Sequence, residues 1–272
     1  MKKNIYQPVP AVIENVIQET GAIKTFTLKP LGEFSFRTGQ FIELTVPGIG
    51  EGPFTPSSDP GIKERIDMTI MNVGCVTNKL HTMKAGDTVG IRGPYGKGYP
   101  LDTFKGKDIL IVGGGVGLAP LRSLLYSLFS SINDYNKVVL CYGARTSADI
   151  VYKYLLPDWS KKDKVQVHVS VDVGDHSWQG NVGLVTTLLQ PGMVDINKAV
   201  AIVCGPPIMM KFVNLKLLDL GFKPQDIYLS MEKNMSCGLG KCGHCRVGKF
   251  YACKDGPVFT YEELKDLHDI WD

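Results

Sequence analysis

The sequence lacks the features that mark membrane proteins and nucleic-acid-binding proteins. Its longest apolar stretches, residues 108–120 and 198–210, are broken by Gly or Pro well before the roughly 20 residues needed to span a bilayer. Neither sign of charge is in excess, because 30 Lys and Arg against 27 Asp and Glu give a formal net charge of +3. No basic stripe with interleaved aromatic residues stands out. We therefore expect no membrane insertion and no nucleic-acid partner.

Patterns of secretion and disulfide bonding are missing as well. The first 16 residues hold no apolar run long enough for a signal-peptide core. Four of the seven cysteines lie in residues 237–253, and the other three, Cys75, Cys141 and Cys204, are scattered through apolar segments. This odd number and this distribution fit reduced thiols in a reducing compartment. We expect a cytoplasmic protein without disulfides.

The chain of 272 residues, 44% of them hydrophobic, is long enough for two domains of ordinary size and a short appendage. Residues 1–102 contain short β-type runs punctuated by Gly and Pro, which predict an antiparallel β-barrel or sandwich, and we expect the barrel. One short helix is expected to begin at Thr77, where a capping hydroxyl precedes Leu80 and Met83.

Residues 103–230 alternate between strand and helix patterns. Near-continuous apolar runs such as "ILIVGG", "KVVLCYGA" and "AVAIVCG" alternate with helical patterns, among them "APLRSLLYSLFSS", "SADIVYKYLL" and "GLVTTLL". This alternation predicts an open parallel α/β sheet covered on both faces, with its ligands at the carboxyl ends of the strands. In residues 231–272, a short closing helix is expected near Thr260.

The most specific pattern lies in this last segment. Its cysteines follow the spacing C-x4-C-x2-C-x7-C, at Cys237, Cys242, Cys245 and Cys253. The first three positions match the plant-type iron-sulfur run, in which four thiolates hold a [2Fe-2S] cluster. Interspersed glycines allow the sharp turns that bring backbone N–H groups onto the sulfurs. A structural zinc site is the alternative, although zinc ribbons usually pair two C-x2-C knuckles across a longer loop.

Two strand ends in the α/β region point to a nucleotide site. In "VGGGVGLAP" the backbone can approach a pyrophosphate and the next helix can direct N–H groups at it, although Leu118 replaces the last Gly of G-x-G-x-x-G. A merely tight turn is the alternative. "CYGAR" places Arg145 within reach of a ribose or phosphate, and "CGPP" places Cys204 at a later strand end, as a ligand neighbour or as simple core.

A weaker signal lies in the barrel. "MNVGCVTNKL" puts Gly74 and Thr77 at the expected start of the short helix. A helix N-terminus with a threonine is a ready anion site, here for a second pyrophosphate. An ordinary helix cap explains the same residues.

Together, "GGGVGLAP", "CGPPIMM" and "MSCGLGKCGHC" with "ACKDGPVFTYEEL" resemble the ferredoxin-NADP reductase superfamily. The sequence is similar to its FAD/NAD(P)-binding electron-transfer subunits: the gamma subunit of NAD(P)-linked nickel-iron hydrogenases (sulfhydrogenases), the corresponding subunit of anaerobic sulfite reductase, and the electron-transfer subunit of dihydroorotate dehydrogenase B. The resemblance covers essentially the whole chain. It departs in the flavin motif R-x-Y-S/T, where Gly52 and Phe54 replace the Arg and the Tyr.

The resemblance implies a barrel that holds FAD, a sheet that holds NAD(P)H, and four cysteines that hold the cluster. The implied flavin contacts are Phe54, Thr55, Pro56, Ser57, Ile70, Met71, Asn72, Gly74, Val76 and Thr77. The implied nucleotide contacts are Gly114, Gly117, Leu118, Ala119, Pro120, Gly143, Arg145, Asp172, Cys204, Gly205 and Pro206. NAD and NADP stay open, because Arg145 suits a ribose hydroxyl or a 2'-phosphate.

The function that follows is electron transfer between NAD(P)H, FAD and a [2Fe-2S] cluster, to or from a catalytic partner subunit of hydrogenase, sulfite reductase or sulfur reductase type. The cofactors carry the chemistry, so no residue is assigned as general acid or base. Two alternatives remain: a self-contained NAD(P)H reductase of a soluble carrier such as ferredoxin, and a redox-sensing interaction protein.

Overall fold

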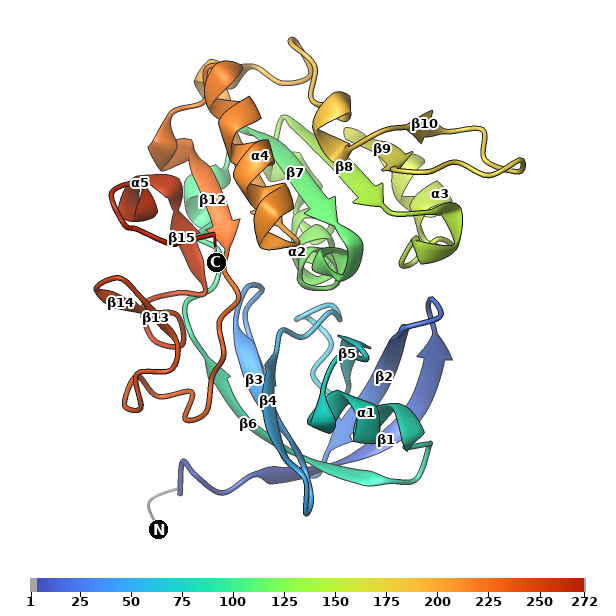
Figure 1. Ribbon diagram of the computed structural model, residues 1–272, viewed down its shortest axis with the longest axis vertical. Helices are drawn as coiled ribbons and strands as arrows, with labels where there is room; N and C mark the ends of the chain where they lie inside the picture. Colours follow the sequence, from blue (N-terminus) through green and yellow to red (C-terminus); the bar gives the residue numbers. More distant parts are fainter. Residues whose placement is uncertain (1–3, 272) are drawn as a thin grey trace.

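The computed structural model describes residues 4–271, which form an antiparallel sheet, a mainly parallel sheet and a C-terminal segment in contact with both (Figure 1). The antiparallel sheet has the strand order β4-β3-β6-β1-β2-β5. Its strands are β1 (Val9–Gln18), β2 (Ile23–Pro30), β3 (Phe41–Val46), β4 (Gly50–Phe54), β5 (Ile66–Met71) and β6 (Thr88–Tyr95).

This sheet curls around one core. Buried residues from strands far apart in the order, such as Ile42 of β3 and Met68 of β5, belong to a single cluster. The predicted antiparallel barrel is confirmed in this form, and we call it the barrel. Strand β4 was not predicted, because its residues "GEGPF" include two glycines and a proline, which are depleted in strands.

Helix α1 (Cys75–Thr82) begins two residues earlier than predicted. Gly74 is its N-cap, and Thr77 lies in the first turn instead of before it. The Thr77 hydroxyl reaches back and accepts the N–H groups of Val73 at 2.9 Å and Gly74 at 2.8 Å. The side chain therefore caps the helix from inside, which is why its position in the sequence misplaced the start.

The parallel sheet has the order β10-β9-β8-β7-β11-β12-β15, and only β15 runs antiparallel to its neighbour. Its strands are β7 (Asp108–Gly114), β8 (Lys137–Ala144), β9 (Val165–Val171), β10 (Asn181–Val182), β11 (Ala199–Cys204), β12 (Ile227–Ser230) and β15 (Val258–Thr260). Alternate residues of β7, such as Ile111 and Val112, enter two different core clusters. Both faces of the sheet are therefore covered, as predicted.

Two long helices follow strands as expected, α2 (Leu118–Ser130) after β7 and α4 (Pro207–Asp219) after β11. The helix predicted at "SADIVYKYLL" is wrong: a 3-10 turn at Ser147–Asp149 precedes an irregular stretch, and α3 covers only Leu156–Ser160. Tyr152 interrupts the pattern with a φ of +55°, which no helix residue adopts. The predicted helix "GLVTTLL" is likewise a 3-10 turn, Val185–Leu188.

The C-terminal segment consists mostly of turns. It includes the short strands β13 (Arg246–Val247) and β14 (Phe250–Tyr251), then β15 and α5 (Tyr261–Leu264). Thr260 caps α5 together with Glu263, which confirms the predicted closing helix. The residue limits given for the three domains stay predictions. No helix within residues 4–271 is long and apolar enough to cross a bilayer.

Candidate functional site

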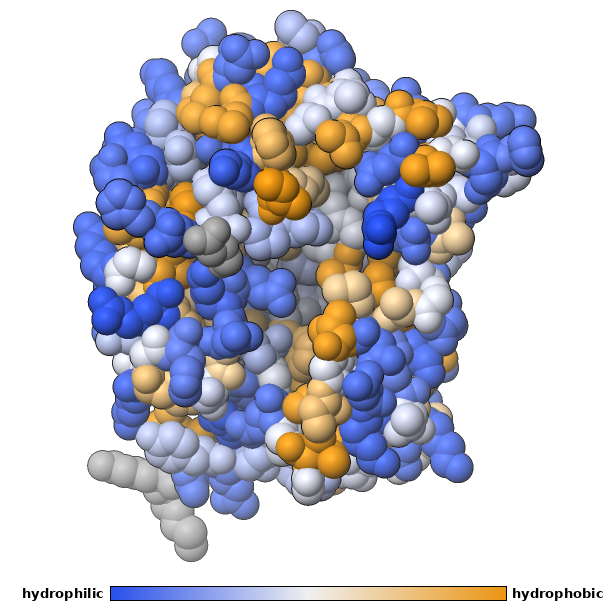
Figure 2. Space-filling view, in the orientation of Figure 1, coloured by the Kyte–Doolittle hydropathy of each residue, from blue (hydrophilic) through white to orange (hydrophobic). Residues whose placement is uncertain are grey.

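A cleft of about 390 Å³ lies between the barrel and the parallel sheet. Figure 2 shows the hollow near the middle of the molecule. The residues predicted from the sequence that line it are Phe54, Thr55, Ile70 and Met71 on the barrel side and Gly117, Ala119, Pro120, Cys204, Gly205 and Pro206 on the sheet side. The structure therefore brings together residues from both predicted nucleotide sites, which lie up to 152 positions apart in the sequence, as Phe54 and Pro206 do.

The other predicted contacts do not line this cleft. Asn72, Gly74 and Val76 continue from the end of β5 over the surface at the start of α1. Arg145 and Asp172 are exposed at the carboxyl ends of β8 and β9. A second group is buried beneath the surface: Pro56, Ser57, Thr77, Gly114, Leu118 and Gly143.

Two of these buried residues have packing roles. Ser57 shares a hydrogen bond of 2.9 Å with Thr69 inside the barrel. A Cβ atom on Gly143 would lie 2.8 Å from Cβ of Val185, so glycine is needed there for the turn that covers β8.

At Gly117 the two strand ends that border the cleft come close together. A Cβ atom on Gly117 would lie 2.5 Å from the carbonyl oxygen of Cys204 and 2.7 Å from Cα of Gly205. The turn after β7 therefore packs directly on the turn after β11, and only glycine permits it. Burial raises the pKa of the Cys204 thiol to about 12, so this cleft residue is a neutral thiol at physiological pH.

The four predicted ligand cysteines lie together in the C-terminal segment as two pairs. Sγ of Cys245 lies 3.2 Å from Sγ of Cys253, and both residues are buried. The pKa of Cys242 is lowered by a backbone hydrogen bond from His244 and by a side-chain hydrogen bond with Cys237, which defines the second pair.

This arrangement has the thiol donors that an iron-sulfur cluster needs. Two pairs of thiols match the two thiolates that each iron of a [2Fe-2S] cluster needs. Backbone N–H groups already point at sulfur: Leu239 donates to Cys237 at 3.3 Å and Gly240 donates to Cys253 at 3.0 Å. Such donors stabilise thiolate and sulfide charge.

The sequence analysis missed Arg92, which reaches this loop from strand β6. Its side chain is only 4% exposed. Nη1 donates to the carbonyl oxygen of Cys237 at 3.3 Å and to the Tyr95 hydroxyl at 3.0 Å, while Nε donates to Glu51 at 2.9 Å. This hydrogen bond from Arg92 lowers the pKa of Glu51. The barrel therefore holds the cysteine loop through a buried cation, a contact that no local pattern announces.

Glu43 was missed as well, although a lone acid inside the apolar strand "FIELTV" was a visible signal. It lies opposite Arg92 in the β3–β6 pairing and is fully buried. Neither carboxyl oxygen has a hydrogen-bond partner within the described part of the chain. Burial raises the pKa of Glu43 to about 7, against the opposing effect of Arg92. The group is thus a buried acid beside the cysteine loop.

We expect Glu43→Gln to change the pH dependence of stability. The folded pKa of about 7 lies above the usual 4.5, so the contribution of Glu43 is fully present below pH 4.5 and is lost as the pH rises through 7. The free energy of unfolding of the wild type, compared with that of Glu43→Gln, should fall by roughly 3 kcal/mol between low pH and pH 8. Melting curves over this range measure the effect, with the exposed Glu33→Gln as the matched control. Parallel pH profiles for wild type and Glu43→Gln would contradict the expectation.

Comparisons with known proteins agree with this architecture. Three family models match in succession: an oxidoreductase FAD-binding domain at residues 11–99, an oxidoreductase NAD-binding domain at 111–215, and the iron-sulfur cluster binding domain of dihydroorotate dehydrogenase B at 232–265. The order of the three models is the order in which the barrel, the parallel sheet and the cysteine loop occur along the chain.

Two curated relatives match almost end to end. The sulfhydrogenase 2 subunit gamma of Pyrococcus furiosus is 38% identical and is aligned over 95% of this chain and 96% of its own. The probable dihydroorotate dehydrogenase B (NAD(+)), electron transfer subunit, of Methanocaldococcus jannaschii is 31% identical over 97% of this chain and 94% of its own.

Solved structures share the fold. A structure of an NADH-dependent reduced ferredoxin-NADP oxidoreductase matches with a TM-score of 0.73 and 25% identity, over 97% of this chain and 91% of its own. The cytochrome b5 reductase domain of Ulva prolifera nitrate reductase matches with a TM-score of 0.69 at 22% identity, over 83% of this chain and 98% of its own, which shows the fold alone. The chain belongs to the family of FAD- and NAD-binding, iron-sulfur electron-transfer subunits that includes those of sulfhydrogenase and dihydroorotate dehydrogenase B, on a ferredoxin-NADP reductase fold.

Proposed function

We propose that this protein is the electron-transfer subunit of a larger redox complex. It moves electrons between NAD(P)H and a catalytic partner subunit, by way of FAD in the barrel and a [2Fe-2S] cluster in the C-terminal segment. When bound, FAD exchanges a hydride with a nicotinamide and single electrons with an iron-sulfur centre. The relatives are subunits of sulfhydrogenase and dihydroorotate dehydrogenase B, which supports a partner of this redox type.

The observation that carries the proposal is the short connection between the cleft and the cysteine loop. Phe41 lines the cleft, and its ring centroid lies 5.7 Å from that of Tyr95. The Tyr95 ring in turn lies against Gly238, where a Cβ atom would be 2.8 Å from it. A flavin in the cleft and a cluster on the cysteines would be neighbours across these two aromatic side chains.

The chain's own residues bind and orient the cofactors. We propose that Phe54 packs on the flavin and Thr55 donates a hydrogen bond to it, while the backbone at Gly74 approaches the FAD pyrophosphate. On the opposite wall, Gly117 and Ala119 face the nicotinamide nucleotide, with Cys204 beside the nicotinamide as a neutral side chain. The four cysteines hold the cluster. We also propose a cytoplasmic location, supported by an odd number of cysteines, four of which are spaced as cluster ligands, because reduced thiols suit a reducing compartment.

The test is anaerobic reduction of the purified protein. NADH or NADPH should bleach the flavin and iron-sulfur absorbance, and an electron paramagnetic resonance signal of a reduced [2Fe-2S] centre should appear with two irons per chain. Comparing the two nucleotides decides between NAD and NADP. A colourless protein that contains zinc would overturn the proposal. Purification from native expression should yield a complex with a metal-bearing catalytic subunit, whereas an active monomer would indicate a self-contained reductase.

Gly74→Ala tests the proposed pyrophosphate site separately from the fold. Gly74 has an extended backbone with a φ of −161°, and a Cβ atom there would meet no atom within 4 Å. The free energy of unfolding should therefore change by at most about 1 kcal/mol. A phosphate approaching the backbone N–H groups at this helix start would meet the new methyl group, so the FAD dissociation constant should rise about tenfold.

Fluorescence titration of the flavin-free protein measures this affinity, and Gly32→Ala in the barrel serves as the control, since its Cβ would have only an ordinary contact at 3.8 Å. Unchanged FAD affinity in Gly74→Ala would remove Gly74 from the proposed site.

A further inference from the structure

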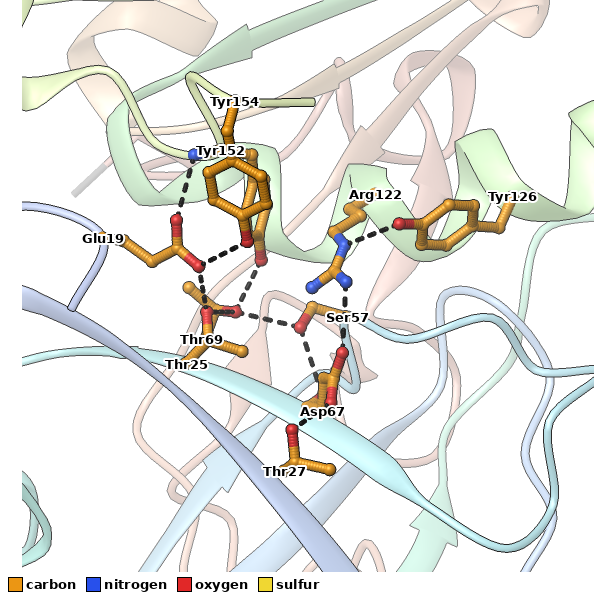
Figure 3. Close-up of polar contacts among 10 residues, drawn as sticks. All are labelled: Glu19, Thr25, Thr27, Ser57, Asp67, Thr69, Arg122, Tyr126, Tyr152 and Tyr154. Carbon is orange, nitrogen blue, oxygen red and sulfur yellow. Dashed lines mark hydrogen bonds and ion pairs between the residues drawn. The ribbon is translucent and has the colours of Figure 1, made fainter. Parts of the chain in front are cut away.

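A polar cluster behind the cleft joins the barrel to the parallel sheet, and Figure 3 shows its side chains converging across the boundary. Arg122 of α2 forms an ion pair with Asp67 of β5, with Nη2 at 3.1 Å from Oδ2. The two side chains are 11% and 19% exposed. Burial alone would lower the pKa of Arg122, but the nearby Tyr152, Tyr126 and Asp67 raise it overall, so the guanidinium stays charged.

Tyr152 makes the second contact across the boundary. The residue is fully buried, and its ring centroid lies 4.6 Å from Cζ of Arg122. Its hydroxyl donates to Oγ1 of Thr69 in the barrel at 2.5 Å, and its backbone N–H donates to Glu19 at 3.3 Å. A bulky residue holds a φ of +55° only where its surroundings fix it. The contacts of Tyr152 with the barrel supply that constraint.

These contacts connect the two elements that supply opposite walls of the cleft. The first turn of α2 places Ala119 and Pro120 on one wall, and Arg122 lies just beyond them on the same helix. Strand β5 places Thr69 and Ile70 on the other wall, and Asp67 precedes them. A change in the Arg122 or Tyr152 contact would therefore alter the separation of the walls without replacing any residue that lines them.

We propose that Arg122 and Tyr152 are positioning residues that hold the two walls of the cleft at one separation and so set the distance between a nicotinamide on the sheet and a flavin on the barrel. This inference rests on the proposed function. Neither side chain exchanges a proton or an electron. Because a misplacement of about 1 Å between reacting groups can cost 100-fold in rate, a modest relaxation of this contact has a large kinetic effect.

The test compares Arg122→Met with Arg65→Met in FAD-replete, cluster-containing protein. Arg65 is the matched control, since it is 64% exposed and pairs with Glu14 on the outside of the barrel. In Arg122→Met, flavin reduction at saturating NADH should slow about tenfold or more. The dissociation constants for NADH and FAD should stay within about twofold, because each nucleotide keeps its own wall. The charge-transfer absorbance of the NADH–flavin pair should weaken.

Two further variants separate positioning from a purely structural role. Arg122→Lys keeps the charge beside Asp67 but loses the planar fork that stacks on Tyr152, so it should restore only part of the rate. Tyr152→Phe removes only the hydroxyl that donates to Thr69 and leaves the core filled, so it should fold even if Arg122→Met does not. Unchanged reduction rates and charge-transfer absorbance in FAD-replete Arg122→Met and Tyr152→Phe would overturn the inference.

Hydrogen exchange distinguishes a failure of the inference on Arg122 and Tyr152 from a failure of the proposed function. In Arg122→Met, amides in residues 66–71 and 150–154 should exchange faster than in the wild type, while those in β11 should not. If neither nucleotide reduces the wild-type flavin, the proposed function is wrong, and the exchange pattern still decides whether Arg122 and Tyr152 hold the two walls together. Unchanged exchange in residues 66–71 and 150–154 of Arg122→Met would count against the positioning role.

Discussion

Replacing Cys245 by serine is expected to remove the iron-sulfur cluster and, with it, electron delivery to any partner. Cys245 is 1% exposed and lies 3.2 Å from Cys253, so no other side chain can take its place as a ligand. Iron content and the electron paramagnetic resonance signal should fall to background. Electron transfer from NAD(P)H to the partner should drop at least about 100-fold, because four thiolates are needed to hold the cluster.

The same variant should keep the first half of the reaction. The cleft is lined by the barrel, the two strand ends and, near the C-terminal segment, Met231, Glu232, Lys233, Met235 and Pro257, but not by Cys245, so reduction of the flavin by NAD(P)H should persist. Cys75→Ser is the control, since Cys75 is exposed on α1 and far from the cysteine loop in the sequence. A Cys245→Ser protein with full iron content and an unchanged signal would show that the cluster is held elsewhere.

Gly117→Ala should give the second large effect, on the nucleotide side of the cleft. The added Cβ would overlap the backbone of Cys204 and Gly205 at 2.5 to 2.7 Å, and backbone cannot move aside as a flexible side chain can. We expect a loss of about 1–3 kcal/mol in stability from overpacking. Separation of the two turns should also weaken NAD(P)H binding about tenfold or more.

Titration of the flavin absorbance with NADH, together with melting curves, measures both effects. Gly21→Ala is the control, because a Cβ atom there meets nothing within 4 Å. Normal NADH affinity in a correctly folded Gly117→Ala protein would exclude this turn from the nucleotide site.

Features that rest on neighbours in the sequence were predictable. The cysteine spacing, the glycine turn after β7 and the apolar strands each depend on residues within a few positions of one another. The structure places the four cysteines together and brings the two strand ends to one cleft, as the α/β pattern implies. The individual FAD and nucleotide contacts stay predictions.

Features that rest on distant residues were not predictable from one sequence. Arg92 and Cys237 are 145 positions apart, and Arg122 and Asp67 are 55 apart. The helix predicted over residues 147–156 failed for the same reason, because contacts of Tyr152 with Glu19 and Thr69 fix a backbone that local propensity does not favour. A helical sequence pattern does not produce a helix where contacts with distant residues fix another backbone conformation.

The contacts of the cysteine loop also determine when in biosynthesis the metal site can be completed. Lys241 donates to the hydroxyl of Tyr6, and Arg92 donates to the carbonyl of Cys237, so the cysteine loop contacts residues 235 and 145 positions earlier in the chain. Strand β15, from the last fifteen residues, covers the edge of β12. A nascent chain has the barrel and most of the sheet long before these pieces leave the ribosome. We therefore expect cluster insertion to be a late event in maturation, and we expect a chain that ends before β15 to leave the edge of β12 unpaired and open to aggregation.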